Sequence, residues 1–347
     1  MKQMLFTLDY ELYGDGSGDV FKHIIDPTYA LLNVADRYNL KFTFFFEVIE
    51  YWRLKEEWNN GNKMGYTQNP IEAIEKQIQD LYRQGHDVQL HLHPQWVNAK
   101  YQEGRWNVDL ADWKLGGYLH EGEYSLVNLL IKGKQSIEEL IKPINPKYRC
   151  IALRAGGYNV QPSKEIVKAM LHSGIYVDSS IYPGGKEQGT LSNYDYTNIP
   201  IDIDYWYVGE ELEMQGDLGL IELPIVAFPI TRWTKYVSRE RIKSLLRNKE
   251  SARNTFDAKI CDRTKGKFSK IKFFFEKECQ TWDFCLLTPS MHKKFLSMIK
   301  SQDRNLFVLV GHPKSYVGER GLKYLLKRTN NVFKYKTISD VYGLILN

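Results

Sequence analysis

The sequence predicts an α/β protein with a mostly parallel sheet and helices outside it. Short apolar segments alternate along the chain with segments of helical periodicity, which is the pattern of βα units. The 347 residues, 43% of them hydrophobic, suffice for a large core in one big domain or two smaller ones. The alternation alone does not distinguish an open sheet from a closed barrel.

Apolar runs and helix-boundary residues define the first elements. Residues 3–9 form an apolar strand, and Asp26-Pro27 then starts a helix, with Asp as N-cap and Pro at the first helical position. Residues 41–46 form the second strand. Asn69-Pro70 starts a helix with apolar residues at helical spacing, and the third strand then runs up to His93.

The remaining elements continue the alternation. A loop rich in Trp, Gly and Asp spans about 94–123, and Ser163 caps a later helix that Gly174 ends. The other expected elements, in chain order, are a helix at 124–141, strands at 150–153, 175–177, 197–208 and 219–228, a helix after Ser290, a strand at 306–310, a helix near 318–328, a strand at 332–336 and a helix after Thr337.

Composition and charge limit the classes of function. A net charge of +5 gives no general case for nucleic-acid binding. The four cysteines contain no Cys-x-x-Cys pair and are typical of reduced thiols. The N-terminal apolar run is too short for a signal peptide, and no run approaches the roughly 18 apolar residues that span a bilayer. We therefore expect a cytoplasmic protein, with a peripheral membrane role still open.

One segment differs from the rest in charge. Residues 231–280 contain fifteen Lys or Arg against six Asp or Glu. They are interpreted as part of an insertion at about 230–290 in a single domain that spans 1–347. The segment is either a solvated helical excursion or a contact surface for an anionic partner, such as a nucleotide-diphosphate, a lipid-diphosphate carrier or an acidic membrane.

Two pairs of polar residues stand at the ends of expected strands. Asp9 and Glu11 end the first strand, and His91 and His93 end the third, directly before Pro94. Residues two apart in a strand point to the same side, so each pair can face one cleft. Two imidazoles there suit a divalent transition metal, although a structural histidine pair fits the pattern as well. A metal would also relieve the repulsion between two adjacent carboxylates.

Three more strand ends carry polar residues. Arg154 precedes Gly156-Gly157, which permits close backbone approach to a ligand, and its guanidinium could hold a carboxylate. Asp178 follows a strand and could orient a histidine. His312 follows the apolar strand 306–310 and is a candidate general acid. Parallel α/β folds place their chemistry at such strand ends, and five of them occur here in order.

This order of motifs resembles the polysaccharide deacetylase family, also called NodB-homology domains or carbohydrate esterase family 4, over residues 5 to about 315. The resemblance implies a distorted (β/α) barrel with about seven strands. It also implies that Asp9 is the catalytic base, that Arg154 positions it, that His312 is the catalytic acid and that Asp178 tunes this acid.

The resemblance further implies a divalent metal, most simply Zn²⁺, held by Glu11, His91 and His93. The chain departs from the family's pattern here. The family's first motif has adjacent Asp-Asp, whereas Tyr10 intervenes between Asp9 and Glu11. Its second motif is His-x-x-x-His, but the fourth position after His91 is Gln95, so His93 would take that place. The residues expected to contact substrate are Trp96, Gly156, Gly157 and Tyr158.

The implied activity is metal-dependent removal of an N-acetyl group from an amino sugar in surface-polysaccharide biosynthesis, as for O-antigen, capsule or lipopolysaccharide. The expected partner is an N-acetylated sugar carried on a nucleotide or a lipid, and not a nucleic acid. Other interpretations are a different C–N amide hydrolase on the same fold, a member of the amidohydrolase superfamily, and a sugar-binding protein with a degenerate site. Metal content and acetate release discriminate between these possibilities.

Overall fold

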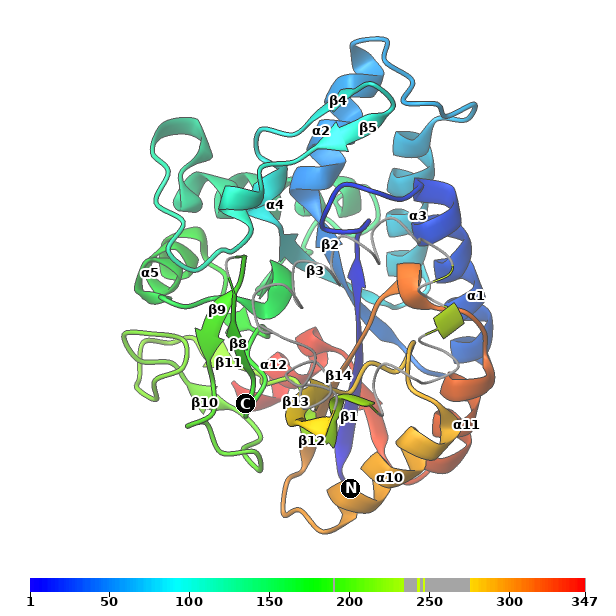
Figure 1. Cartoon of the computed structure of the whole chain (residues 1–347), viewed down its shortest axis with the longest axis vertical. Coiled ribbons are helices and arrows are strands. Elements are labelled where there is room, and N and C mark those ends of the chain that lie inside the picture. Colours follow the sequence, from blue (N-terminus) through cyan, green and yellow to red (C-terminus); the bar gives the residue numbers. More distant parts are fainter. Residues whose placement is uncertain (190, 234–241, 244–245, 247–274, 347) are drawn as a thin grey trace.

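The computed structural model describes residues 1–189, 191–233, 242–243, 246 and 275–346. A nine-stranded sheet forms its centre, and helices lie outside the sheet (Figure 1). The strands of this sheet are β1 (Gln3–Tyr10), β2 (Phe42–Glu47), β3 (Asp87–Leu92), β6 (Ala152–Ala155), β7 (Val177–Asp178), β10 (Trp206–Tyr207), β11 (Ile221–Glu222), β14 (Leu306–Gly311) and β15 (Lys334–Lys336).

The sheet curls into a distorted barrel. Strands β14, β1, β2, β3, β6, β7 and β11 are parallel neighbours in that order. Directly after β11, Ile225 forms a parallel bridge with Val308 of β14, and the N–H of Val226 donates to the carbonyl of Val308 at 2.8 Å. This bridge joins the two ends of the seven-strand series. The α/β class and the barrel therefore agree with the sequence prediction.

The described helices cover the outside of the sheet. They are α1 (Asp26–Ala35), α2 (Val48–Asn59), α3 (Pro70–Arg83), α4 (Leu126–Ile141), α5 (Lys164–Ser173), α10 (Pro289–Lys300), α11 (Arg320–Thr329) and α12 (Ile338–Ile345). All except α2 were expected from the sequence. Helix α2 follows β2 without a loop, and the side chain of Glu47 accepts from the N–H groups of Ile49 and Glu50 at its start. Glutamate is not a typical N-cap residue, so no clear signal marks the start of α2 in the sequence.

Two expected strands are corrected. Only Trp206–Tyr207 of the predicted strand at 197–208 is a strand, and the segment contains Pro200. The predicted strand at 219–228 divides at Pro224 into β11 and β12 (Ala227–Thr231). Proline cannot donate a ladder hydrogen bond, which explains the break. Strand β12 pairs with β13 (Lys277–Thr281), and two further hairpins are β4 (Lys100–Gln102) with β5 (Arg105–Asn107) and β8 (Lys186–Gln188) with β9 (Asn193–Asp195).

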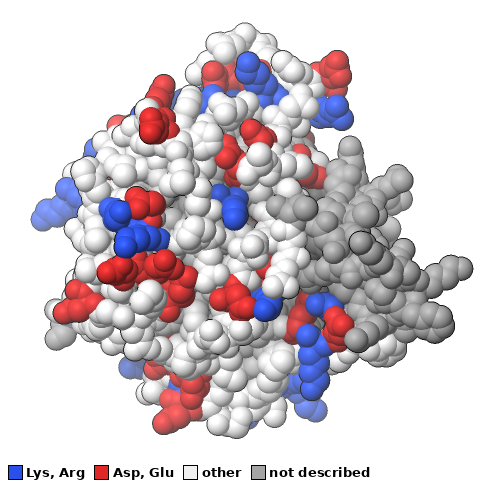
Figure 2. All heavy atoms as spheres, turned by 60° about the vertical axis from the view of Figure 1, so that its left-hand side comes forward, with Lys and Arg blue, Asp and Glu red and all other residues white. Residues whose placement is uncertain are grey.

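Several predictions concern the surface. No helix among the described residues is long and apolar enough to cross a membrane. Acidic and basic side chains are interspersed on the face shown in Figure 2. Most of the basic segment 231–280 lies outside the described residues, so its role as a contact surface stays a prediction. Cys150, Cys279 and Cys285 are free, as expected, and Cys261 lies outside the described residues.

Candidate active site

The carboxyl ends of four barrel strands bring the predicted polar residues together. Asp9 lies in β1 and Glu11 follows that strand directly. His91 of β3 is the direct neighbour of Arg154 in β6, and His312 follows β14, which pairs with β1. All these strands are parallel, so their ends meet on one rim of the barrel.

Arg154 holds Asp9 in a buried ion pair. Its Nη1 donates to Asp9 Oδ1 and to Thr7 Oγ1, each at 2.7 Å, and its other nitrogens donate to the carbonyl and hydroxyl of Ser179. The guanidinium also lies over the ring of Phe45. Burial raises the pKa of Asp9, but the neighbouring groups, Arg154 first among them, together outweigh burial and hold this pKa below its usual value. Asp9 is therefore ionised at neutral pH.

Glu11, His91 and His93 form a group whose ligand atoms lie within 4.8 Å of one another. Glu11 Oε2 lies 2.6 Å from Nε2 of His93 and 3.4 Å from Nε2 of His91. Both Nε2 atoms are buried, and apart from these contacts with Glu11 neither has a hydrogen-bond partner among the described residues. Burial lowers the pKa of His93 despite the nearby charge of Glu11, which favours the neutral imidazole that a metal requires. One carboxylate oxygen and two imidazole nitrogens fit Zn²⁺.

Neighbouring groups fix both histidine rings. His91 Nδ1 lies 2.8 Å from the carbonyl oxygen of Arg154, so it carries the proton and leaves the lone pair on Nε2. A Cβ atom on Gly156 would lie 2.5 Å from the ring of His93, so this glycine makes room for the ring. We expected Gly156 to contact substrate, whereas in the structure it packs against His93.

Gln95 contacts His93 on the Nδ1 side of its ring, away from the nitrogen that faces Glu11. Its side-chain nitrogen is 2.8 Å from His93 Nδ1, while its Oε1 is buried without a partner. A metal on Nε2 requires the proton on Nδ1. The opposite orientation of the Gln95 amide would accept that proton, at the cost of the 3.3 Å hydrogen bond that its nitrogen donates to the carbonyl of Gly14. Gln95 therefore acts on His93 instead of ligating.

His312 has a carboxylate partner, but not the predicted one. Its Nδ1 lies 3.1 Å from Asp283 Oδ2, and its Nε2 lies 3.4 Å from Asp9 Oδ2. Burial lowers the pKa of His312, but the hydrogen bond and charge of Asp283, together with the charge of Asp9, raise it overall. The imidazolium is thereby favoured next to the ionised Asp9.

The prediction that Asp178 tunes His312 is wrong, because Asp283 occupies that position. Asp178 instead accepts from the N–H and hydroxyl of Ser180 at 2.9 Å each. Its neighbour across the β7–β11 pair is Glu222. Burial raises the pKa of both carboxyl groups, and each is hydrogen-bonded to the other. They form a buried acid pair in the wall of the barrel.

Tyr158 reaches the site with its side chain. Its hydroxyl lies 3.5 Å from His312 Nε2, and its φ is +59°, a left-handed conformation that is uncommon outside glycine. Tyr196 stabilises this turn by donating to the carbonyl of Tyr158 and accepting from the N–H of Val160. Gly157 has a φ of +61°. The glycine adopts this conformation without strain, whereas Tyr158 is stabilised in it by Tyr196.

Two tryptophans of the loop 94–123 lie in different surroundings. Trp96 was expected to contact substrate, but it is only 1% exposed and packs edge-on against Trp106. The prediction is corrected, because Trp96 belongs to the core. Trp113 is half-buried, lies edge-on to His93 and approaches Gly14 and Gly157. It is the aromatic residue of the loop 94–123 that borders the site.

Sequence reasoning also missed three buried charged or acidic groups. Lys314 donates to Glu11 Oε1 at 2.7 Å. Glu47 ends an apolar strand just as Asp9 does, a signal that could have revealed it. Burial raises the pKa of Glu47 well above its usual value and that of Glu50 to about 8, because the charge of Glu11 adds to it. A pKa of about 8 favours the protonated form of Glu50 at neutral pH.

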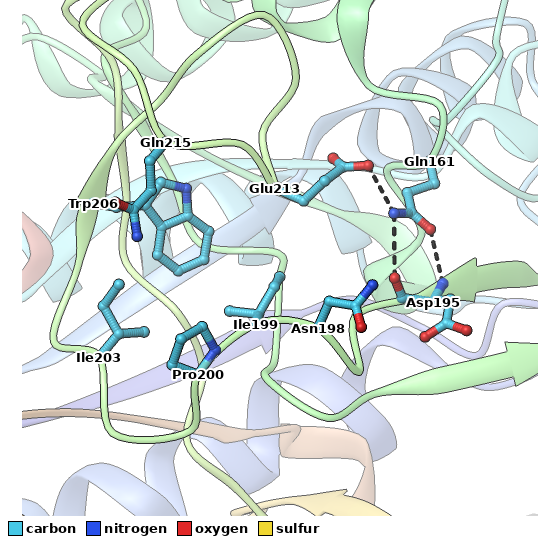
Figure 3. Close-up of a pocket in the computed structure, with 9 residues that line it drawn as sticks. All are labelled: Gln161, Asp195, Asn198, Ile199, Pro200, Ile203, Trp206, Glu213 and Gln215. Carbon is cyan, nitrogen blue, oxygen red and sulfur yellow. Dashed lines mark hydrogen bonds between the residues drawn. The ribbon is translucent and has the colours of Figure 1, made fainter.

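A cavity of about 270 Å³ lies apart from these residues and is lined by Gln161, Asp195, Asn198, Ile199, Pro200, Ile203, Trp206, Glu213 and Gln215 (Figure 3). Polar groups at one end bond to each other. Gln161 donates to Glu213 Oε1 at 2.7 Å and accepts from the N–H of Asp195 at 2.7 Å. No strand-end residue of the candidate site lines this cavity.

Comparisons with known proteins bear on the fold. No family model matches the chain, and no curated protein matches it. A GH57-type branching enzyme from Pyrococcus horikoshii aligns over 99% of this chain and 70% of its own, with 11% identity and a TM-score of 0.51. A polysaccharide deacetylase from Mycobacterium smegmatis aligns over 99% and 89%, with 14% identity and a TM-score of 0.45. The first match indicates a shared fold and leaves the activity open.

Proposed function

We propose that this protein is a metal-dependent hydrolase that removes an N-acetyl group from an amino sugar in a precursor of a surface polysaccharide. The proposal rests on one observation: a set of metal-ligating residues and an acid–base pair lie on the same rim of the barrel. Glu11, His91 and His93 offer a ligand set for a divalent ion. Asp9 and His312, 3.4 Å apart, offer an ionised carboxylate and a favoured imidazolium beside it.

Each residue of the site has a separate role in amide hydrolysis. A zinc ion held by Glu11, His91 and His93 would supply a Lewis acid for the amide carbonyl and would acidify a water molecule. Asp9, kept ionised by Arg154, takes a proton from the attacking water. His312, whose pKa Asp283 raises, gives a proton to the departing nitrogen. Water and amide thus become acetate and amine.

Tyr158 supplies a further donor. Burial and the charge of Asp9 raise the pKa of its phenol well above the usual value, so the hydroxyl keeps its proton. Because it lies on the same rim, 3.5 Å from His312, we assign it as a donor to the reacting carbonyl oxygen, where charge develops. Trp113, beside His93 and Gly157, offers an aromatic face on which a sugar ring can stack.

The test is acetate release by zinc-loaded protein from three classes of substrate: a nucleotide-linked N-acetyl amino sugar, a lipid-diphosphate-linked one and an N-acetylated oligosaccharide. Wild-type protein should release acetate from at least one, and Asp9→Asn should bind the same sugar without release. Sugar binding with no release by the wild type would instead support a non-catalytic sugar-binding protein. Equal release by metal-free protein would support a different amide hydrolase.

A further inference from the structure

We propose that Lys314 confines Glu11 to a single metal-facing oxygen and weakens the hold of this site on its divalent ion. The inference rests on the metal site of the proposed function. It concerns how tightly the site binds its ion, and it does not depend on which amide is hydrolysed.

Lys314 is built into the site. It stands two residues after His312, in the short turn Pro313–Ser315 that follows β14. Its side chain is only 12% exposed. Its ammonium donates to Glu11 Oε1 at 2.7 Å and to the carbonyl of Leu12 at 2.6 Å. The strand end that carries the candidate acid therefore also carries a cation for the candidate ligand.

The two oxygens of Glu11 are divided between different partners. Oε1 is held by Lys314, whereas Oε2 lies 2.6 Å from His93 Nε2 and 3.4 Å from His91 Nε2. The carbonyl of Leu12 and the ring of Tyr13, 5.5 Å from the ammonium, hold the lysine in place. A carboxylate engaged in this way has one oxygen left for a metal.

The charges lead to the same inference. Glu11 is the only carboxylate of the set Glu11, His91 and His93, and Lys314 already balances its charge. Asp9 is paired with Arg154. A divalent ion thus enters a group of side chains with no net negative charge and meets a buried ammonium that repels it. The bound ion is correspondingly electron-poor, which favours polarisation of a carbonyl over tight retention.

The experiment compares zinc affinity in wild-type protein and Lys314→Met, measured by competition with a chromophoric chelator. The variant should bind zinc about tenfold more tightly or better, because a buried positive charge is gone. The visible bands of the cobalt-loaded variant should weaken as Oε1 joins the ligands. Unchanged or weaker zinc binding would overturn the proposal, since a lysine that merely fastened two loops together would give that result.

Two matched variants keep the test decisive. Lys314→Arg keeps the charge and should bind zinc within about threefold of wild type. Lys314→Gln keeps a donor without the charge and should bind zinc more tightly than wild type. It serves in place of Lys314→Met if that variant does not fold. Tighter binding by Lys314→Arg would contradict the charge argument.

The outcome is separable from that of the proposed function, because zinc binding is measured without substrate. Tighter zinc binding by Lys314→Met supports the inference even if no acetate is released from any substrate. Acetate release by wild-type protein, combined with unchanged zinc affinity in Lys314→Met and Lys314→Gln, would refute the role of Lys314 and leave the proposed function standing.

Discussion

Replacement of Arg154 by methionine should lower the free energy of unfolding by about 3–5 kcal/mol, the range for breaking a buried ion pair. Arg154 is fully buried and donates to Asp9, to Thr7 and twice to Ser179. Methionine fills much of the space but donates to none of them. The carboxylate of Asp9, 2% exposed, then keeps only the longer contact with His312 at 3.4 Å, and this poorly compensated charge dominates the loss.

The double variant Asp9→Asn/Arg154→Met isolates that charge. The amide that replaces the Asp9 carboxylate is neutral. The double variant should therefore be at least about 2 kcal/mol more stable than Arg154→Met alone, because it avoids the cost of an unpaired buried charge. Urea denaturation at pH 7 measures both, provided that the m-values match. A loss below about 1 kcal/mol in Arg154→Met, or no recovery in the double variant, would refute the reasoning.

The same pair predicts a pH dependence. The pKa of Asp9 is lower in the folded protein than in the unfolded chain, because Arg154 and the other neighbouring groups together outweigh burial. The pair therefore contributes stability above the unfolded pKa, and this contribution is lost as the pH falls through the folded pKa. In Arg154→Met the pKa of Asp9 should rise, so this acid-dependent loss should disappear when unfolding is followed between pH 7 and pH 3.

Three further predictions concern turnover. Asp9→Asn should retain zinc and lose at least about 10²-fold in kcat, as expected for a general base, and wild-type kcat would place the base elsewhere. Asp283→Asn should move the alkaline limb of the kcat profile to lower pH, because Asp283 raises the pKa of His312 and activity is lost once that acid deprotonates; an unmoved limb would contradict this role. Tyr158→Phe should lower kcat about 10²-fold with little change in KM. The control is Tyr194→Phe, which removes a hydroxyl that bonds Tyr182 and should leave both constants near wild type. Equal effects of the two variants would exclude a specific role for Tyr158.

Local periodicity was sufficient to predict the paired residues of the site. Residues two apart in a strand share a side, so Asp9 with Glu11 and His91 with His93 could be placed together before any fold was known. The place of Arg154 could be predicted for a related reason, because parallel strands end on one rim. In the structure it is the direct neighbour of His91. These inferences need only the strand and its direction.

The partner of His312 depends on how the barrel closes. Asp283 reaches the site because it forms a parallel bridge with Val310 of β14, just before His312. This contact joins residues that no periodicity connects, and the surrounding segment was interpreted as an insertion. Asp178 follows a strand end as expected, but its side chain turns to Ser180 and Glu222.

Loop residues were the least predictable part. Trp96 and Trp113 lie in the same irregular stretch, and only tertiary packing decides that Trp96 enters the core while Trp113 borders His93. Lys314 was overlooked because a lysine after a strand is usually a solvated surface residue. Its burial follows from the meeting of the β1 and β14 ends at Glu11.

The central claim is that Glu11, His91 and His93 together hold a divalent ion, and calorimetric titration of metal-free protein with zinc tests it most directly. Wild-type protein should bind one ion per chain at this site. His91→Ala and His93→Ala should each weaken this binding by at least about 100-fold, since each removes one of three protein ligands. Unchanged stoichiometry and affinity in His91→Ala would contradict the claim.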